Sequence, residues 1–167
     1  MNRMVFATFI SFVILLRISE LFLSKRNEKW LIQNGALEYG QMHYPFIVLL
    51  HVLFFISLIV EYSMQQPSSF SLLLLLLYFL LIGFKTWTVL SLGHYWNTKI
   101  FHIPNAPLIK QGPYKFIKHP NYLIVIAEIA VIPLIFHLYF TAIIFSFLNS
   151  IILFIRIKEE NKVLQIK

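Results

Sequence analysis

The sequence contains no cysteine and few charged residues, and each shortage excludes a class of protein or site. A chain without cysteine cannot form disulfides, thiolate metal sites or a cysteine nucleophile. Only 13% of the 167 residues are charged, whereas 59% are hydrophobic. A soluble domain of this size cannot bury so many apolar side chains, so the composition predicts an integral membrane protein.

The sequence also lacks the short motifs that mark common nucleotide, hydrolase and metal sites. There is no GxGxxG, Walker A, GxSxG or HExxH pattern, and no metal site is expected. The formal net charge is +7. In a membrane protein, an excess of lysine and arginine indicates topology and contact with anionic headgroups, so we expect membrane lipids and no nucleic acid as partners.

Five apolar runs have about the 17–25 residues that a helix needs to cross a bilayer. They predict an all-α fold, a polytopic membrane bundle of about five transmembrane helices. No linker or repeat divides the chain, so residues 1–167 are expected to form a single domain. The last two runs are separated by almost nothing, which predicts a tight helical hairpin. The runs are Val5–Ser24, Pro45–Tyr62, Ser69–Leu92, Pro120–Phe136 and Leu138–Ile155.

Lysine and arginine are distributed unevenly among the loops. The loops after the first and third runs and the C-terminal tail are basic, whereas the loops after the second and fourth runs contain neither residue. The positive-inside rule therefore predicts an N-terminus outside the cell membrane and a C-terminus in the cytoplasm. The hairpin returns the start of the fourth run and the end of the fifth to the same cytoplasmic side.

The longest stretch that is not simply hydrophobic is LIKQGPYKFIKHPNY, at the start of the fourth run. Proline is tolerated at the first position of a helix and disfavours helical geometry in the residue before it. We therefore predict His119 as an N-cap and Pro120 as the first helical residue. The free N–H groups of this helix start, together with the imidazole, could hold a carboxylate or a phosphate. A plain loop-to-helix junction with basic flanks is the alternative interpretation.

Ionisable residues in the fourth and fifth runs are further candidates. Arg156 and Glu160 are four residues apart and share a helix face, and the hairpin brings them near His119 and Tyr122. Alternatively, Arg156 is a snorkelling arginine in a solvated tail. Glu128 lies two turns into the fourth run, where an ionisable side chain is costly. It is a candidate catalytic residue, and an interhelical hydrogen bond is its alternative role.

Polar residues of the first three runs support two hypotheses of a different class. Arg17 and Glu20 are spaced to pair on one helix face, and Lys85 is close enough to the inner membrane surface to snorkel. With Glu128, they would form the polar pathway of a non-enzymatic membrane carrier or anchor subunit. His51 is expected to be a satisfied interior histidine, whereas a haem anchor would use it as an axial ligand.

Three motifs occur in an order that resembles the isoprenylcysteine carboxyl methyltransferase family. They are LGHYWN, then PLIKQGPYKFIKHPNY, and then RIKEE after the hairpin. The family signature is approximately G-x-Y-x-x-x-[RK]-H-P-x-Y, followed by R-I-x-x-E-E. The resemblance covers about Ser91 to Leu164, which is the expected cofactor-binding part of the chain. Lys118 stands where the family usually has an arginine.

The resemblance implies a small all-helical membrane bundle whose cytosol-facing pocket holds S-adenosylmethionine, with a lipid substrate that enters from the bilayer. It places Arg156 beside the reacting substrate as a catalytic residue. Glu160 matches the acidic cofactor ligand, and alignment on the paired glutamates leaves Glu159 as the alternative. The other implied cofactor contacts are Ala106, Pro107, Leu108, Ile109, Tyr114, His119, Pro120, Asn121 and Tyr122.

The chemistry of these residue types suits the implied cofactor. The helix start with His119 suits its carboxylate, Glu160 suits its ammonium, and Tyr114 offers a π face to the adenine or the sulfonium. Arg156 could hold an anionic acceptor oxygen, in which case no general base is needed. The expected reaction is methyl transfer to the oxygen of a lipophilic substrate, such as a prenylcysteine carboxylate or an alkylpyrone-type polyketide. Phospholipid amine methylation is the less favoured chemistry.

Overall fold

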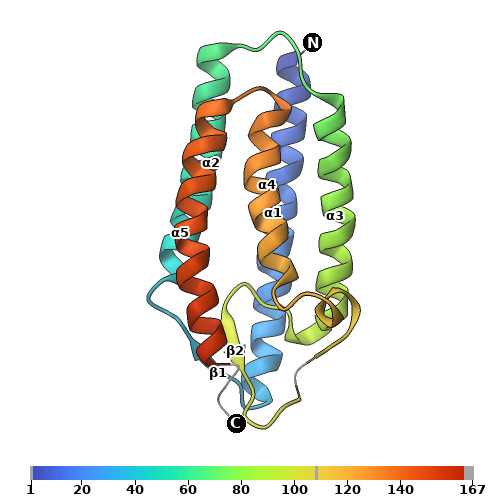
Figure 1. Ribbon diagram of the computed structural model, residues 1–167, viewed down its shortest axis with the longest axis vertical. Coiled ribbons are helices and arrows are strands. Elements are labelled where there is room, and N and C mark those ends of the chain that lie inside the picture. The colour runs from blue at the N-terminus through green and yellow to red at the C-terminus, as the bar shows by residue number, and fades with distance from the viewer. Residues whose placement is uncertain (1, 108, 164–167) are drawn as a thin grey trace.

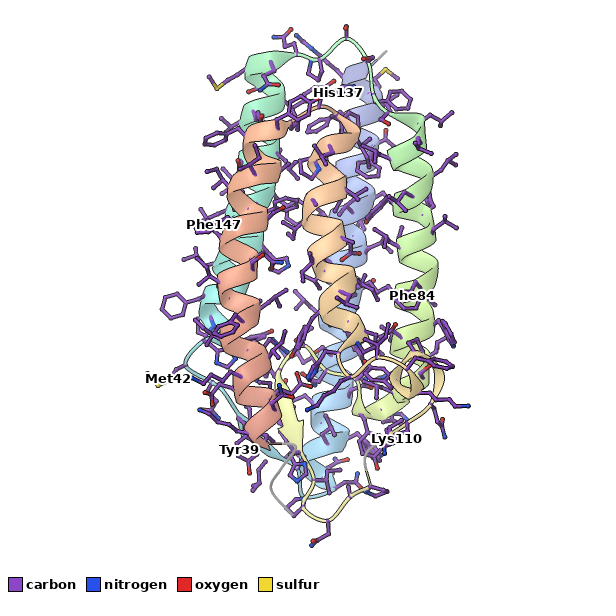
Figure 2. The ribbon with its side chains drawn as sticks, in the orientation of Figure 1. Tyr39, Met42, Phe84, Lys110, His137 and Phe147 are labelled. Atoms are coloured by element: carbon purple, nitrogen blue, oxygen red, sulfur yellow. The ribbon has the colours of Figure 1, made fainter. Side chains whose placement is uncertain are left out.

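The computed structural model describes residues 2–107 and 109–163, and within them five α-helices run side by side (Figure 1). The prediction of an all-α helical bundle is confirmed. The C-terminal end of α5 lies at the end of the bundle that also carries Lys110, and His137 lies at the opposite end (Figures 1 and 2). We call these the lysine-rich end and the His137 end. The helices are α1 (Asn2–Gln33), α2 (Tyr44–Gln65), α3 (Leu72–Leu92), α4 (Pro120–Ile135) and α5 (Tyr139–Val163).

Four of these helices, α1, α2, α3 and α5, are long and apolar enough to cross a membrane. The fifth, α4, has 16 residues and a length of about 24 Å, so it is shorter than the other four. It packs against α3 and α5 and lies in front of α1 in Figure 1. More than half of its residues are buried, including Glu128 and Ile129. The shortest helix is therefore the centre of the bundle.

Large apolar side chains cover the outer surface of the four long helices. Leu73 of α3 and Phe147 of α5 are exposed by more than 60%, and Figure 2 shows Phe147 pointing away from the bundle. Exposed apolar surface on this scale marks contact with a membrane or a partner. The lengths of the helices fit a bilayer.

The first helix is longer than predicted and continues nine residues beyond Ser24, to Gln33. The segment Lys25–Gln33 contains neither glycine nor proline and is rich in good helix formers, so nothing in it ends the helix. The helix ends before Gly35, which has a φ of +80° that few other residues adopt readily.

A two-stranded antiparallel sheet at the lysine-rich end was not predicted. It pairs β1 (Leu37–Tyr39) with β2 (Ile100–His102). Lys99 stands between the sheet and α1, with its Nζ 2.9 Å from Glu28 and 3.4 Å from Glu38. Partial burial opposes the lysine charge, but the hydrogen bond to Glu28 and both carboxylates raise the Lys99 pKa above its ordinary value. The contact therefore ties the end of α1 to the segment that follows α3.

An aromatic cluster holds α1, α2 and the α4–α5 connection together at the His137 end. The rings of Phe6 and Tyr62 stack with centroids 3.7 Å apart, and Phe136 meets Phe6 edge-on at 5.0 Å. All three side chains are buried. Aromatic rings fill this part of the bundle. The two cavities described below lie nearer the lysine-rich end.

The start of α5 is stabilised by a carboxylate from another helix. The buried Glu61 of α2 accepts hydrogen bonds from the backbone N–H groups of Phe140 and Thr141, at 3.0 and 2.8 Å. The first N–H groups of a helix have no partner within it, and a negative charge there also complements the helix dipole. Gln65 donates to the same carboxylate at 2.9 Å. Glu61 thus replaces a local N-cap residue.

Replacing Glu61 with alanine is expected to lower the free energy of unfolding by about 1–3 kcal/mol, because two helix-start N–H groups lose their acceptor. Thermal unfolding of the detergent-purified protein measures the loss. Glu61→Gln keeps one acceptor oxygen and should lose less, and Gln65→Ala should have little effect. Wild-type stability of Glu61→Ala would contradict this role.

Candidate functional site

The first part of the site is the start of α4 at the lysine-rich end. As predicted, His119 is the N-cap residue and Pro120 is the first residue of the helix. Proline at this position costs no hydrogen bond, and the Tyr122 N–H donates to the His119 carbonyl at 3.2 Å. The rings of His119 and Tyr122 stack at 5.4 Å. The two side chains therefore lie side by side at the start of the helix.

The second part is the C-terminal portion of α5, which meets the start of α4. The Arg156 Nε donates to the Tyr122 hydroxyl at 2.8 Å, and that hydroxyl in turn donates to Glu160. His119 Nδ1 lies 3.6 Å from the Glu160 carboxylate, and its Nε2 lies 3.1 Å from Asn161 Oδ1. The two polar clusters, 34 to 42 residues apart in sequence, thus form one network.

The third part is the segment that follows α3, which lies within the expected cofactor-binding part but contains none of the individually predicted site residues. It comprises η1 (Gly93–Tyr95) and residues 96–98. The buried Asn27 of α1 donates to the carbonyls of Gly93 and Trp96, at 3.2 and 2.7 Å. The Arg156 guanidinium donates to the Thr98 carbonyl at 2.5 Å. The LGHYWN motif indicated this segment, and the aromatic and amide residues of YWNT, unusual after an apolar run, are the signal for its individual residues.

The loop before α4 contributes Tyr114 through η2 (Gly112–Lys115). Gly112 has a φ of +53°, and an added Cβ would lie 2.0 Å from the Ser91 hydroxyl oxygen of α3. Only glycine allows this turn to pack so closely on α3. Burial raises the pKa of the Tyr114 phenol, and the nearby Glu160 carboxylate adds to the shift. Tyr114 therefore stays neutral throughout the physiological range.

These parts enclose a polar cavity of about 100 Å³ at the lysine-rich end. Two buried polar atoms in its lining residues, Trp96 Nε1 and Asn121 Oδ1, have no hydrogen-bond partner within the described chain. Such atoms are costly unless a ligand or water pairs with them. The lining also includes Tyr95, Asn97, Lys99, Tyr114, His119, Tyr122, Arg156 and Glu160.

A second, larger cavity of about 290 Å³ extends from the same place toward the middle of the bundle, and we call it the apolar chamber. Its lining surface is mostly apolar, with polar side chains such as Arg17, Glu20 and His51 among the aliphatic ones, and it comes from α1, α2, α4, α5 and the 96–98 segment. Several of its residues on α1 and α2 are themselves exposed on the outer surface, so the chamber reaches the lipid-facing side between these helices. These residues are Ile18, Leu21, Val48 and Val52.

The polar cavity and the apolar chamber share a wall. Trp96, Asn121, Tyr122 and Arg156 line both of them. Tyr122 and Arg156 are also hydrogen-bonded to one another, so the wall is held in place. A ligand in the polar cavity and a ligand in the chamber would meet at these four side chains.

A closed cluster of four charges lies deeper in the bundle. Glu128 pairs with Arg17 at 2.7 Å and with Lys85 at 3.1 Å, and Glu20 pairs with the same two cations at 3.0 and 2.5 Å. The predicted Arg17–Glu20 pair is confirmed. The prediction that Lys85 snorkels was wrong, because its side chain is only 8% exposed and points at two carboxylates.

The comparison with known proteins decides the family. The model of the isoprenylcysteine carboxyl methyltransferase (ICMT) family matches residues 72–166, which is more than half of the chain. The chain belongs to the isoprenylcysteine carboxyl methyltransferase family. The match starts with α3, earlier than Ser91, where the sequence motifs begin. Together with the four long apolar helices, membership identifies an integral membrane protein of a methyltransferase family.

Two bacterial relatives of this family member match nearly its whole length. A Bacillus subtilis (strain 168) protein, described as uncharacterized protein YpbQ, is 43% identical over 158 residues, which cover 93% of this chain and 94% of the relative. A Haemophilus influenzae protein, described as uncharacterized, is 29% identical over 151 residues, which cover 89% of this chain and 88% of the relative. No solved structure matches the chain.

The residues predicted from the family motifs fall into two groups in the structure. Tyr114, His119, Asn121, Tyr122, Arg156 and Glu160 line the polar cavity. The remaining predicted residues do not line either cavity within the described part of the chain, and Leu108 lies outside the described residues. Glu159 pairs instead with Lys162 at 2.6 Å on the surface. The other members of this second group are Ala106, Pro107, Ile109, Pro120 and Glu128.

Proposed function

We propose that this protein is an integral membrane methyltransferase that uses S-adenosylmethionine to methylate an oxygen of a lipophilic acceptor. The observation that carries the proposal is the wall shared by the polar cavity and the apolar chamber. Trp96, Asn121, Tyr122 and Arg156 form it. A polar methyl donor and an apolar acceptor require two adjoining sites of opposite character, and this bundle contains such a pair.

The residues of the polar cavity suit S-adenosylmethionine as the donor. The Glu160 carboxylate suits the ammonium group, and the start of α4 beside His119 suits the carboxylate. The unpaired Trp96 Nε1 donor and Asn121 Oδ1 acceptor offer hydrogen bonds to the remaining polar atoms. S-adenosylmethionine is larger than a cavity of about 100 Å³, so its binding requires this cavity to widen.

Arg156 is the residue best placed to act on the acceptor. S-adenosylmethionine, when bound, supplies a methyl group activated by the sulfonium. The Arg156 guanidinium is fixed by Tyr122 and by the Thr98 carbonyl, and it lines the apolar chamber as well as the polar cavity. A fixed cation can hold a carboxylate or an acidic enol oxygen in line with the methyl group. An acceptor that is already ionised needs no general base.

The apolar chamber indicates a lipophilic acceptor that arrives through the bilayer. The exposed aliphatic residues between α1 and α2 give it an apolar approach from the lipid-facing surface. A prenylcysteine carboxylate and an alkylpyrone-type polyketide both fit this description. The basic residues near the polar cavity, including Lys99 and Lys110, favour a cytoplasmic position for the site and an external N-terminus.

The cofactor assignment is tested by titrating the purified protein with S-adenosylhomocysteine in a calorimeter. Glu160→Ala is expected to weaken binding by about tenfold or more, because it removes a charged hydrogen-bond partner. His119→Ala should also weaken binding. Glu159→Ala is the matched control, since this neighbour pairs with Lys162 outside the cavity.

Two results would count against the assignment. A wild-type protein that does not bind S-adenosylhomocysteine would remove the proposed function. Equal affinities for wild type, His119→Ala and Glu160→Ala would remove these residues from the cofactor site.

A further inference from the structure

Several polar side chains line the apolar chamber, and Asn149 is the one that the proposed reaction does not use and whose buried polar atom is unpaired within the described chain. Asn149 of α5 lines the chamber and is only 2% exposed. Its amide Nδ2 is buried and has no hydrogen-bond partner among the residues described. A buried, unpaired amide in aliphatic surroundings destabilises a protein, and a leucine of nearly the same shape would not. The position therefore calls for a reason beyond stability.

The packing of α2 against α5 places Asn149 along the chamber. Ser57 bonds Thr141 at 2.8 Å, and Phe54 meets Phe145 at 5.5 Å, so the two helices run antiparallel with a steady register. One further turn along this register brings Asn149 to the level of His51. Arg156 lies seven residues beyond Asn149 on α5, which is two turns or about 10 Å. Asn149 and Arg156 therefore mark two separate levels of one chamber.

His51 adds a second polar group at the level of Asn149. It lines the chamber, and its Nδ1 lies 2.8 Å from the Ile47 carbonyl oxygen. A carbonyl only accepts hydrogen bonds, so Nδ1 carries the proton and Nε2 of the neutral ring is an acceptor. An amide donor and an imidazole acceptor at one level together match a hydroxyl group, which both accepts and donates.

We propose that Asn149, with His51, binds a second oxygen function of the acceptor, about two helical turns from the oxygen that is methylated. This inference rests on the proposed function and deepens it, because it restricts the acceptor to lipophilic molecules with two separated oxygens. Asn149 is a specificity-determining residue in this arrangement. Arg156 faces the reacting oxygen, and Asn149 fixes how far the molecule enters.

The test uses rigid probes of matched shape. Biphenyl, 4-hydroxybiphenyl and 4,4′-dihydroxybiphenyl carry no, one and two hydroxyl groups, and the two hydroxyls of the last lie at opposite ends. Calorimetric titration of the full-length protein in detergent is expected to show about fivefold tighter binding of the dihydroxy probe than of the monohydroxy probe. In Asn149→Leu this preference should disappear. In Ser150→Leu, one residue away on the exposed surface, it should remain.

A stability measurement separates recognition from a structural role. Asn149→Leu is expected to raise the unfolding temperature, because it removes an unpaired buried amide, while it abolishes the preference for the second hydroxyl. Asn149→Ala, which cannot overfill the chamber, should abolish the preference as well. An unchanged preference in both variants, or a loss of stability in both, would overturn the inference. A wild type that shows the probe preference but binds no S-adenosylhomocysteine would overturn the proposed function alone.

Discussion

Methyl transfer is expected to fall about a hundredfold or more when Arg156 is replaced by alanine, because the acceptor oxygen loses the cation that aligns and stabilises it. In the structure, the guanidinium is buried and already oriented by Tyr122 and Thr98. Arg156→Lys keeps the charge but cannot bond both partners in the same plane, so it should recover only part of the activity. The rate is measured by adding each purified variant to a lipid extract from cells that lack the gene and following the incorporation of labelled methyl groups into the lipids.

Two further measurements make the Arg156 result specific. S-adenosylhomocysteine affinity should change far less than the rate, because the proposed contacts to the donor are made mainly by other residues of the polar cavity. Lys158→Ala, on the exposed side of the same helix, should methylate as well as wild type. Full activity in Arg156→Ala would remove this arginine from the reaction, and an equal loss of rate and of cofactor binding would make it a cofactor ligand instead.

The largest loss of stability is expected for Glu128→Leu. Its carboxylate is 3% exposed and pairs with both Arg17 and Lys85, so its removal leaves one positive charge in excess inside the bundle. Breaking a buried ion pair from one side typically costs about 3–5 kcal/mol of the free energy of unfolding. Thermal unfolding in detergent, together with the yield of folded protein, measures the effect.

The matched control for Glu128 removes one cation as well. The double variant Lys85→Leu, Glu128→Leu leaves the Arg17–Glu20 pair intact and neutral, so most of the lost stability should return. A catalytic Glu128 makes a different prediction, namely that activity stays lost in this double variant after its stability returns. A carrier that uses the four charges would lose transport in both the single and the double variant. Neither its wild type nor its variants would bind S-adenosylhomocysteine.

The sequence allowed the main juxtaposition of the site to be predicted, and the reason is the membrane. Two apolar runs with almost no residues between them must return to the side where they began, which brings Tyr122 next to Arg156 without any knowledge of packing. The helix start at His119 and Pro120 was equally predictable, because proline restricts its own backbone and that of its neighbour.

The rotation of the helices could not be predicted in the same way. In a soluble bundle, the polar face of each helix shows which side is buried, but here the lipid-facing and core-facing sides are both apolar. The partners of Lys85 therefore could not be identified, and a snorkelling lysine was expected. The role of Asn27, which anchors the segment after α3, was hidden for a different reason. It lies in the part of α1 beyond Ser24, where the polar sequence predicts a loop and not a helix.

The two cavities that meet at the shared wall are built largely by different parts of the chain, so the residues of one cavity can be substituted without changing the other. Most residues of the polar cavity lie within the portion that matches the family, whereas α1 and α2, which supply much of the chamber, precede it. If the proposed function holds, substitutions in the first two helices are expected to change which lipophilic acceptor binds while the polar cavity keeps its ligand. A chimera that joins this N-terminal part to the α3–α5 part of a relative separates the two contributions, because acceptor binding is expected to follow the first two helices.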